Sequence, residues 1–545
     1  MSKEGFTPPL LKNIATWEYE LQYDEDRTFI LEGIKAGFSL VDSDVIINEL
    51  PQACVSNSAS LRSNKENKRK LEEQITHELM CGNYIICHQK PKIVSAINSI
   101  PKPNGTVRLI HDLSRPVDTG LNAYASKGEV KYQTLSDAVS ILRPGWFMAK
   151  IDLQSAYRSV HIPVSEHGLT GLSWIFEGSH KPVFMSDTRL PFGARKSPGI
   201  FNRLTQSIRR MMARRGFTIV AYLDDFFLCG PNFHTCLQAY NTLIRLLRQL
   251  GFQVNWNKVT DPCQRLCFLG VVIDTVSGTL SLNEEKRKDL VNLLCSYQTR
   301  TRANRRSLES LAGKLTWAAL VTPWGRAHTR ETFSLLSTLK QPSHKAKLHS
   351  IKADIDWWLF WLRNGTNARR IWLMSTEIYM VDTDACSLAG GAFCGGDWLY
   401  SHWRGDMSSH HINTKELAAV VLAARRWSHL WSGHKVIIRT DNTVTQAVIN
   451  NGTALNHTCL MLLKEIAHLA LHFNFTITAI HIPGRTNILA DCISRLHERS
   501  QICKLAHLLC IPLNHMNCTN HMSHSSWQFI QQMQSRADQR HSIKM

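Results

Sequence analysis

The stretch 217–230, near the middle of the chain, constrains the fold more than any other. It reads FTIVAYLDDFFLCG, with two β-prone apolar runs on either side of the adjacent acids Asp224 and Asp225. This pattern predicts a buried hairpin whose turn holds the acid pair. Two ordinary acids at a surface turn would explain the pair. A divalent cation, which prefers hard oxygen ligands, would explain carboxylates that are costly to bury unpaired.

Composition narrows the class of protein. The chain has 545 residues, enough for several domains, and a formal net charge of +19, which indicates a polyanionic partner such as nucleic acid or an anionic membrane surface. Fifteen cysteines without a CxxC pair fit a reducing compartment better than a disulfide framework. No signal peptide or membrane-spanning run is visible. We therefore expect a soluble intracellular protein, cytoplasmic and/or nuclear, with no membrane partner.

A third acid lies upstream of the hairpin. The stretch 146–162, WFMAKIDLQSAYRSVHI, predicts a strand that ends at Asp152 and a short helical segment after it. If this strand lies beside the hairpin, Asp152 completes a carboxylate cage with Asp224 and Asp225. Two metal ions held by such a cage stabilise the attacking and leaving oxygens of an in-line phosphoryl transfer.

The tetrapeptide 222–225, YLDD, resembles the YxDD box of reverse transcriptases, and the neighbouring segments match that family in order. The resemblance implies that Asp152 and Asp224 are the metal ligands of the palm and that Asp225 supports the site or joins the ligation. It also implies that Tyr157 blocks a ribose 2′-hydroxyl, so that deoxynucleotides are preferred. A core aromatic residue is the plainer interpretation of Tyr157, and the two roles are compatible.

The same resemblance implies four further nucleotide-binding residues. Lys102 and Arg108 lie on either side of the turn 103–105, PNG, and would hold the triphosphate from a fingers hairpin. Gly193 would let the backbone approach the nucleotide, and Lys258 would lie near the pyrophosphate. For Lys102, Arg108 and Lys258 an ordinary surface or turn position is the alternative.

The stretch 189–204, RLPFGARKSPGIFNRL, resembles the second palm motif, a loop that leads into a helix with Pro198 in its first turn. Many retroviral enzymes have Gln where this chain has Phe192. The LPFG form is similar to that of DIRS-type retrotransposons. Together with the N-terminal residues 1–75, it points to a DIRS-type or related retroelement.

Four more acids follow the change of pattern after residue 371, each near the end of a predicted strand or helix: Asp384, Glu416, Asp441 and Asp491. Local roles would explain them singly. Asn413 and Glu416 could form a capping box, Asp441 could cap a helix, and Asp384 could be a turn acid.

The joint order and spacing of these four acids resemble ribonuclease H. That resemblance implies a second pair of metal ions and a role for His481, which precedes Asp491 by ten residues, in proton transfer or product release.

Two basic or ligand-rich segments are less specific. The run 299–306, TRTRANRR, fits either a solvated helix start or a thumb that grips duplex phosphates. Cysteines and histidines in residues 501–545 do not match a zinc pattern well, and a poorly ordered tail is the simpler expectation.

The predicted fold class is α+β and multidomain, with a right-hand polymerase, a connection and an α/β ribonuclease H-like domain. The predicted domains are an N-terminal extension (1–75), fingers and palm (76–280), thumb (281–340), connection (341–375), the ribonuclease H-like domain (376–500) and a C-terminal tail (501–545).

The predicted function is an RNA-directed DNA polymerase with RNA–DNA hybrid ribonuclease H activity, encoded by a retrotransposon. Its cofactor would be Mg2+, or Mn2+, with two ions in each site. Its partners would be an RNA template, a DNA primer, RNA–DNA hybrid and deoxynucleoside triphosphates, in an oligomeric state that the sequence does not give. The alternative is a catalytically inactive nucleic-acid-binding remnant or a domesticated retroelement protein.

Overall fold

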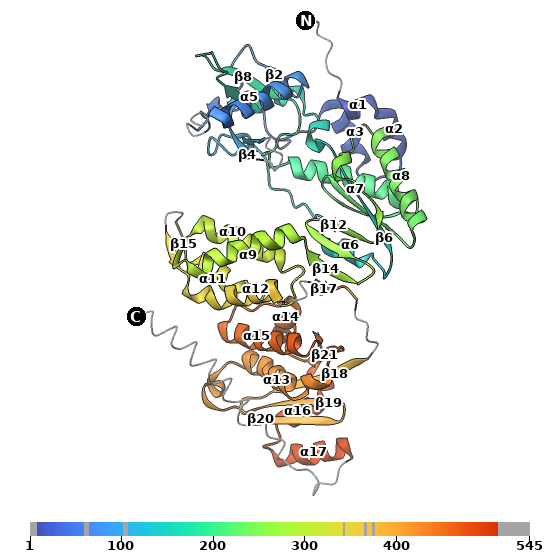
Figure 1. The fold of residues 1–545 in the computed structure, drawn as a ribbon, viewed down its shortest axis with the longest axis vertical. Helices are drawn as coiled ribbons and strands as arrows, with labels where there is room; N and C mark the ends of the chain where they lie inside the picture. The colour runs from blue at the N-terminus through green and yellow to red at the C-terminus, as the bar shows by residue number, and fades with distance from the viewer. Residues whose placement is uncertain are drawn as a thin grey trace. The chain divides into compact units, whose positions relative to one another are not determined.

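The structure is a computed structural model that describes residues 8–58, 61, 65–101, 107–341, 344–364, 368–372 and 377–510. The chain forms two compact units (Figure 1). The first comprises Met1–Leu269 with Ile273–Ser277, and the second comprises Gly270–Val272 with Gly278–Met545. Within the described ranges, no helix is both long enough and apolar enough to cross a membrane. Both helices and sheets build each unit, as expected for the mixed α and β class.

The first unit contains a five-stranded sheet with the order β1-β3-β7-β8-β2, a four-stranded sheet with the order β11-β6-β10-β9, and the hairpin β4-β5. Its strands are β1 (Ala53–Cys54), β2 (Tyr84–Ile86), β3 (Ile93–Val94), β4 (Ala96–Pro101), β5 (Val107–Asp112), β6 (Phe147–Asp152), β7 (Gly171–Trp174), β8 (Val183–Asp187), β9 (Thr218–Tyr222), β10 (Asp225–Gly230), β11 (Thr260–Cys263) and β12 (Arg265–Phe268). Its helices are α1 (Pro9–Lys12), α2 (Ile14–Glu20), α3 (Arg27–Ala36), η1 (Ile47–Glu49), α5 (Lys65–Met80), η2 (Leu121–Tyr124), α6 (Leu135–Ser140), η3 (Ala156–Ser159), η4 (Val164–Leu169), α7 (Ser197–Arg214), α8 (Phe233–Gln249) and η5 (Trp256–Lys258).

The four-stranded sheet is the apolar centre of this unit. Strands β6 and β10 are central, and their side chains are mostly buried, as is typical of strands covered on both faces. Helix α7 contacts β9, and α8 contacts β6, β10 and β11. As predicted, Pro198 lies in the first turn of α7, and β6 ends at Asp152.

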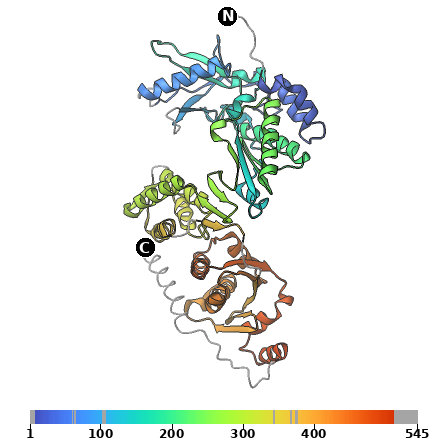
Figure 2. The ribbon, with the colours of Figure 1, turned by 45° about the vertical axis from the view of Figure 1, so that its right-hand side comes forward.

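The N-terminal helices supply part of the same core, and Figure 2 shows them beside α7 and α8. Trp17 is fully buried, and its indole Nε1 donates to the carbonyl oxygen of Leu250 at 2.9 Å. Gly251 has a φ of +93°, and a Cβ there would lie 2.6 Å from the carbonyl oxygen of Pro9. Arg210 of α7 forms ion pairs with Asp24 at 2.6 Å and with two neighbouring acids.

The second unit begins with a helical layer. Strand β13 (Val271–Asp274) crosses the boundary between the units. The helical layer comprises β14 (Thr279–Leu282), α9 (Glu284–Thr299), β15 (Arg302–Asn304), α10 (Arg305–Ala318), α11 (Arg330–Ser337), β16 (Lys345–Lys347), η6 (His349–Ile351), α12 (Lys352–Asn364) and β17 (Ala368–Arg370). Within residues 281–340, α9, α10 and α11 are helical, residues 281–282 complete β14, residues 319–329 form turns and a bend, and the helices are interrupted at residues 302–304. These residues form a strand because they pair with β16. Trp358 of α12 is fully buried.

The remainder of the second unit is built on a five-stranded sheet with the order β20-β19-β18-β21-β22. Strands β20, β19 and β18 are antiparallel, and β18, β21 and β22 are parallel. Its elements are β18 (Ile378–Ala385), β19 (Ala389–Cys394), β20 (Asp397–His402), η7 (Gly405–Ser409), α13 (Ile412–Trp427), η8 (Ser428–Leu430), β21 (Lys435–Thr440), α14 (Thr443–Asn451), α15 (His457–His472), β22 (Thr476–His481), η9 (Gly484–Thr486), α16 (Ile488–Ser494) and α17 (Arg499–Leu509).

This sheet has helices packed on both of its faces, because successive residues of β20 belong to different apolar clusters. Leu399 packs into the cluster of α13 and α15, whereas Trp398 and Tyr400 pack with α16 and α17. Alternation of side chains along a strand is the reason. Helix α17 runs across the predicted boundary at residue 500, and the cysteines and histidines beyond residue 510 lie outside the described residues.

Trp17→Ala should destabilise the first unit by about 3–5 kcal/mol, because it removes a fully buried indole and its hydrogen bond. Denaturant unfolding monitored by circular dichroism would measure the loss. Tyr19→Ala on the same helix is the control, since Tyr19 is 70% exposed and its removal should cost under about 0.5 kcal/mol. Equal effects of the two substitutions would show that the N-terminal helices do not stabilise the core.

Candidate active sites

The first group of carboxylates lies at one end of the four-stranded sheet. Asp152, the last residue of β6, is the register partner of Asp225, the first residue of β10. Tyr222 and Asp225 pair across the hairpin, so its turn is Leu223-Asp224 rather than the predicted Asp224-Asp225. Leu223 has φ 50°, a conformation that is uncommon outside glycine. This turn brings the Asp224 carbonyl to the amide of Leu153, which donates to it at 3.0 Å. The structure thus brings the three predicted acids together.

The electrostatics of this group favour a bound cation. Burial raises the pKa of Asp224, and the negative charge of Asp152 adds to the rise. Burial also raises the pKa of Asp225 to about 6, against the opposing charge of Lys150. The Oδ1 atom of Asp225 is buried and has no hydrogen-bond partner. An unpaired buried carboxylate oxygen fits a hard divalent ion.

The chain itself supplies two contacts to Asp152 from one turn. Asn255 donates its side-chain amide to Oδ1 at 2.9 Å, and Lys258 places Nζ 3.2 Å from Oδ2. Lys258 therefore lies at the carboxylate group. Asn255 is a contact that the sequence analysis missed, although it stands only three residues before Lys258.

Three side chains stack beside the same group. The rings of Tyr157 and Phe192 are 4.9 Å apart and nearly parallel, and the guanidinium of Arg108 lies 5.5 Å from the centre of the Phe192 ring. Burial raises the pKa of the Tyr157 phenol, and Asp224 contributes to the rise. Phe192 thus takes part in the site through its aromatic ring. A glutamine has no ring and could not make this stacking or the cation–ring contact.

Gly193 is required for a packing reason. It has φ 129°, and a Cβ there would lie 1.9 Å from the carbonyl oxygen of His111, whose amide donates to Phe192 at 2.9 Å. The close approach observed is therefore to the β5 strand that carries Arg108. Lys102 lies outside the described residues.

The second group of carboxylates belongs to the five-stranded sheet of the second unit. Asp384 lies in β18, Glu416 lies in the second turn of α13, and Asp441 follows β21. One oxygen from each of the three lies within 4.8 Å of the other two, a spacing that suits a shared metal ion. The structure thus brings these three predicted acids together.

Burial is the main cause of the unusual pKa values in this group. It raises the pKa of Asp384 to about 6, although Ser494 donates to Oδ2 at 2.5 Å. It raises the pKa of Glu416 to about 9, and the neighbouring acids Asp384 and Asp441 add to the rise. The Oε2 atom of Glu416 is buried without a hydrogen-bond partner. The donor set is all carboxylate oxygen, which fits a hard divalent cation.

The remaining two predicted residues lie at the edge of this group. Asp491 forms an ion pair with Arg495 at 2.8 Å, and its charge contributes to the raised pKa of Asp384. His481, at the end of β22, is exposed, and its Nε2 lies 3.1 Å from the carbonyl oxygen of Asp441.

The local alternatives for these acids are not what the structure shows. His411, rather than Asn413, caps α13, and Asn413 accepts from the Asn442 amide at 2.9 Å. Asn442, rather than Asp441, caps α14. Asp384 lies within β18 and not in a turn, and so does Asp382, which is paired with Arg439.

Lys415 is a buried cation beside Glu416 that the sequence analysis did not single out. Its Nζ donates to the carbonyl oxygens of Ser387 and Ser408, both at 2.8 Å. These bonds join the β18–β19 turn and the η7 segment to α13, so Lys415 helps to hold the strand of Asp384 against the helix of Glu416. In the sequence, Lys415 stands just before the apolar helical run LAAVVLAA, and nothing there distinguishes it from an ordinary lysine at the start of a helix.

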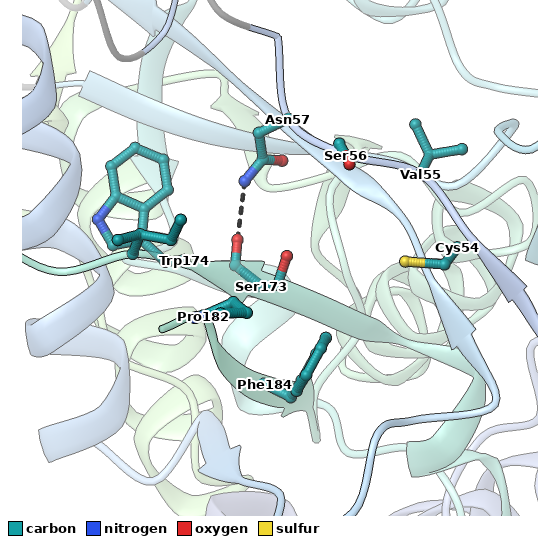
Figure 3. Close-up of a pocket in the computed structure, with 9 residues that line it drawn as sticks. Cys54, Val55, Ser56, Asn57, Ser173, Trp174, Pro182 and Phe184 are labelled. Carbon is teal, nitrogen blue, oxygen red and sulfur yellow. Dashed lines mark hydrogen bonds between the residues drawn. The ribbon is translucent and has the colours of Figure 1, made fainter. Parts of the chain in front are cut away.

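A cavity of about 200 Å³ lies in the first unit, away from these groups (Figure 3). It lies between the extended segment after β1 and the β7–β8 hairpin, and the Asn57 amide spans it to the carbonyl oxygen of Ser173 at 2.7 Å. None of the predicted site residues lines it.

Comparison with known families concerns the first unit. Residues 100–273 match the family model described as reverse transcriptase (RNA-dependent DNA polymerase). The chain contains a reverse transcriptase domain of the retroviral and hepadnaviral type. That domain includes Asp152, Asp224 and Asp225. Reverse transcriptases use divalent metal ions, in keeping with the acidic groups described above.

Curated relatives of the reverse transcriptase domain include Protein P of duck hepatitis B virus, 30% identical over 159 residues, and the Gag-Pro-Pol polyprotein of bovine leukemia virus, 25% identical over 284 residues. These matches cover 29% and 51% of the chain, and 19% of each relative. The chain thus spans about a fifth of the length of the curated relatives that it matches.

Solved structures extend the likeness of fold beyond the reverse transcriptase domain. Foamy viral protease-reverse transcriptase in complex with double-stranded DNA has a TM-score of 0.52 at 16% identity, and the match covers 86% of this chain and 82% of that one. The same protein with an RNA/DNA hybrid has a TM-score of 0.50 at 15% identity, over 86% of this chain and 63% of that one. The polymerase fold expected from the sequence is therefore confirmed.

Glu416→Gln should stabilise the metal-free protein, because it removes a carboxylate that is costly to ionise where it is buried. The stabilisation should be absent below the ordinary carboxyl pKa, grow as the pH rises towards about 9, and be constant above it. At pH 7, a gain of roughly 1 kcal/mol would raise the melting temperature by about 2–4 °C. Differential scanning calorimetry in EDTA would measure it.

Two observations control this experiment. Glu465→Gln should lower the melting temperature, because Glu465 is buried but paired with Arg425 at 2.6 Å. Added Mg2+ should stabilise the wild-type protein more than Glu416→Gln, because the substitution removes a ligand from the second carboxylate group only. A Glu416→Gln protein that melts below the wild type in EDTA would contradict the electrostatic account.

Proposed function

We propose that the chain is an RNA-directed DNA polymerase that also cleaves the RNA strand of RNA–DNA hybrids. The observation that supports the polymerase best is the meeting of Asp152, Asp224 and Asp225 within the segment that matches the reverse transcriptase model. The primer 3′-hydroxyl would attack the α-phosphate of a deoxynucleoside triphosphate on an RNA template. The three carboxylates would hold two Mg2+ ions, or Mn2+.

Bound divalent ions would supply charge stabilisation at the attacking and leaving oxygens of an in-line phosphoryl transfer. The chain's own residues orient the reactants. The β6–β10 register sets the separation of Asp152 and Asp225, and Asn255 fixes the rotamer of Asp152. Lys258 keeps a positive charge beside the group, where it would offset the charge of the departing pyrophosphate.

Selection of the incoming nucleotide would depend on the stacked side chains. We propose that Tyr157, held by Phe192, excludes a ribose 2′-hydroxyl by its ring, and that Arg108 binds the triphosphate as a fork while Lys102 contributes a point charge. Gly193 would keep the segment after Phe192 close to the strand of Arg108.

The second activity is supported by the convergence of Asp384, Glu416 and Asp441 on one end of a mixed sheet. We propose that these acids and Asp491 hold two further Mg2+ ions and that His481 assists proton transfer or product release. Selectivity for the RNA strand would come from contacts with 2′-hydroxyl groups. A foamy viral protease-reverse transcriptase has been solved with an RNA/DNA hybrid, which makes such a hybrid a reasonable partner for a chain of similar fold.

The LPFG sequence around Phe192 supports a retrotransposon origin, with the DIRS type as the nearest group, and we propose this as the source of the chain. We also propose an intracellular location, in the cytoplasm and/or the nucleus. The cysteines of the described residues are all free thiols, which suits a reducing compartment.

The alternative is a nucleic-acid-binding remnant without activity. All seven carboxylates are present, and six of them lie in two compact groups, which favours the enzyme. Extension of a DNA primer on an RNA template by the purified protein, in Mg2+ and then in Mn2+, distinguishes the two. Tight binding of hybrid without extension would favour the remnant.

Asp224→Asn should reduce primer extension by at least about 100-fold and leave hybrid cleavage within about twofold of wild type, because the two carboxylate groups belong to different units. Asp441→Asn should do the reverse. Gel assays of primer extension and of labelled-RNA cleavage measure both activities on each variant. Loss of both activities from either substitution would contradict two separate sites.

Tyr157→Ala should admit ribonucleotides, lowering the preference for deoxynucleotides by about tenfold or more, because it removes the ring that would meet the 2′-hydroxyl. The measurement is kcat/KM for a matched pair of triphosphates. Tyr157→Phe is the control and should keep the preference, since the stacked ring rather than the hydroxyl faces Phe192. If Tyr157→Ala kept the wild-type preference for deoxynucleotides, Tyr157 would not be the residue that excludes ribonucleotides.

A further inference from the structure

A short two-stranded ribbon joins the region predicted as the thumb to the region predicted as the connection. Strand β15 comes before α10, and β16 comes after α11, some forty residues later in the chain. They pair in antiparallel register, with Arg302 opposite Lys347, Ala303 opposite Ala346 and Asn304 opposite Lys345. We call residues 302–304 and 345–347 the basic ribbon.

The two faces of the basic ribbon differ sharply. Cross-strand partners share a face, and neighbours along a strand point to opposite faces. The pair Ala303 and Ala346 therefore marks the inner face, and Ala303 is buried. Arg302, Lys345 and Lys347 share the outer face and are all exposed.

The outer face gathers positive charges close to one another. Arg302 and Lys347 are like charges directly opposite each other, which destabilises a sheet. Within the part of the chain that the structure describes, neither they nor Lys345 form an ion pair. The nearby Glu309 is already paired with Arg305 at 2.8 Å. Three more exposed cations lie next to the ribbon in the chain, Arg300, Arg306 and Lys340.

We propose that the basic ribbon binds the phosphate backbone of an RNA–DNA hybrid outside both carboxylate groups. Phosphates remove the repulsion between Arg302 and Lys347, and cations on two strands suit the paired phosphate rows of a duplex. The ribbon belongs to the same compact unit as Asp384, Glu416 and Asp441. The choice of hybrid rests on the function proposed for that group. The ribbon positions the duplex and reads no sequence.

The sequence run TRTRANRR suggested only half of this surface. Its arginines were equally compatible with a solvated helix start, and nothing in the sequence placed Lys345 and Lys347 beside them. The pairing of β15 with β16 creates the surface.

The test is the salt dependence of hybrid binding by the full chain, measured by fluorescence anisotropy in EDTA so that no chemistry occurs. Each phosphate contact contributes about 0.7–0.9 to the slope of log K against log salt. Lys345→Gln with Lys347→Gln should reduce that slope by about one to two and weaken binding about tenfold or more at 150 mM salt. Arg302→Gln alone should reduce it by about one.

The control has the same chemistry and spacing. Lys286→Gln with Lys288→Gln removes two exposed lysines from α9, where Glu284 lies 3.9 Å from Lys288, and should leave the slope unchanged. An unchanged slope in the ribbon variants, or equal loss in the control, would overturn the proposal. So would binding of the ribbon to anionic lipid vesicles in preference to the hybrid.

The outcome is independent of the proposed activity. Wild-type binding with a reduced slope in the ribbon variants supports the ribbon even if no cleavage or extension is detected, and that result would count against the proposed function alone. Normal cleavage and extension with an unchanged slope would count against the ribbon alone. With excess enzyme, cleavage by the ribbon variants should recover its wild-type rate, because the ribbon contributes to binding and not to chemistry.

Discussion

Repulsion between buried carboxylates is the interaction on which both candidate sites depend. Each site collects three acids, and each leaves one buried oxygen without a hydrogen bond, on Asp225 in one unit and on Glu416 in the other. The protein offsets this only in part, with Lys258 at Asp152 and Ser494 at Asp384. Side chains that repel one another stay together only where the backbone is fixed by other contacts. The rest of each unit provides that rigidity.

In the first unit this rigidity comes from a sheet whose core draws on distant parts of the chain. The acids lie at the ends of β6 and β10, and α8 packs against both strands. Trp17 is buried in the same core, where it donates a hydrogen bond to Leu250. Arg210 of α7 is held by the acidic turn after α2. The N-terminal helices are thus structurally continuous with the sheet that carries the acids. They contribute to the packing of that core.

Local patterns in the sequence predict correctly those elements where the pattern coincides with the chemistry. The end of β6 at Asp152 and the hairpin of Asp224 follow from alternation and apolar runs. The predicted turn residues were wrong, because cross-strand pairing of Asp225 with Asp152 draws that residue into the ladder. Strand β15 was not predicted, because a three-residue strand has no periodicity of its own and forms only when residues 345–347 pair with it.

Local propensity and spacing in the sequence were enough to identify the acids, their order, and the strands and helices that carry most of them. Only the folded chain shows that Glu416 meets Asp384 and Asp441, that the Phe192 ring contacts both Tyr157 and Arg108, and that two basic segments form one ribbon. Such contacts join residues far apart in the chain. Their formation depends on how whole elements pack, which no local pattern encodes.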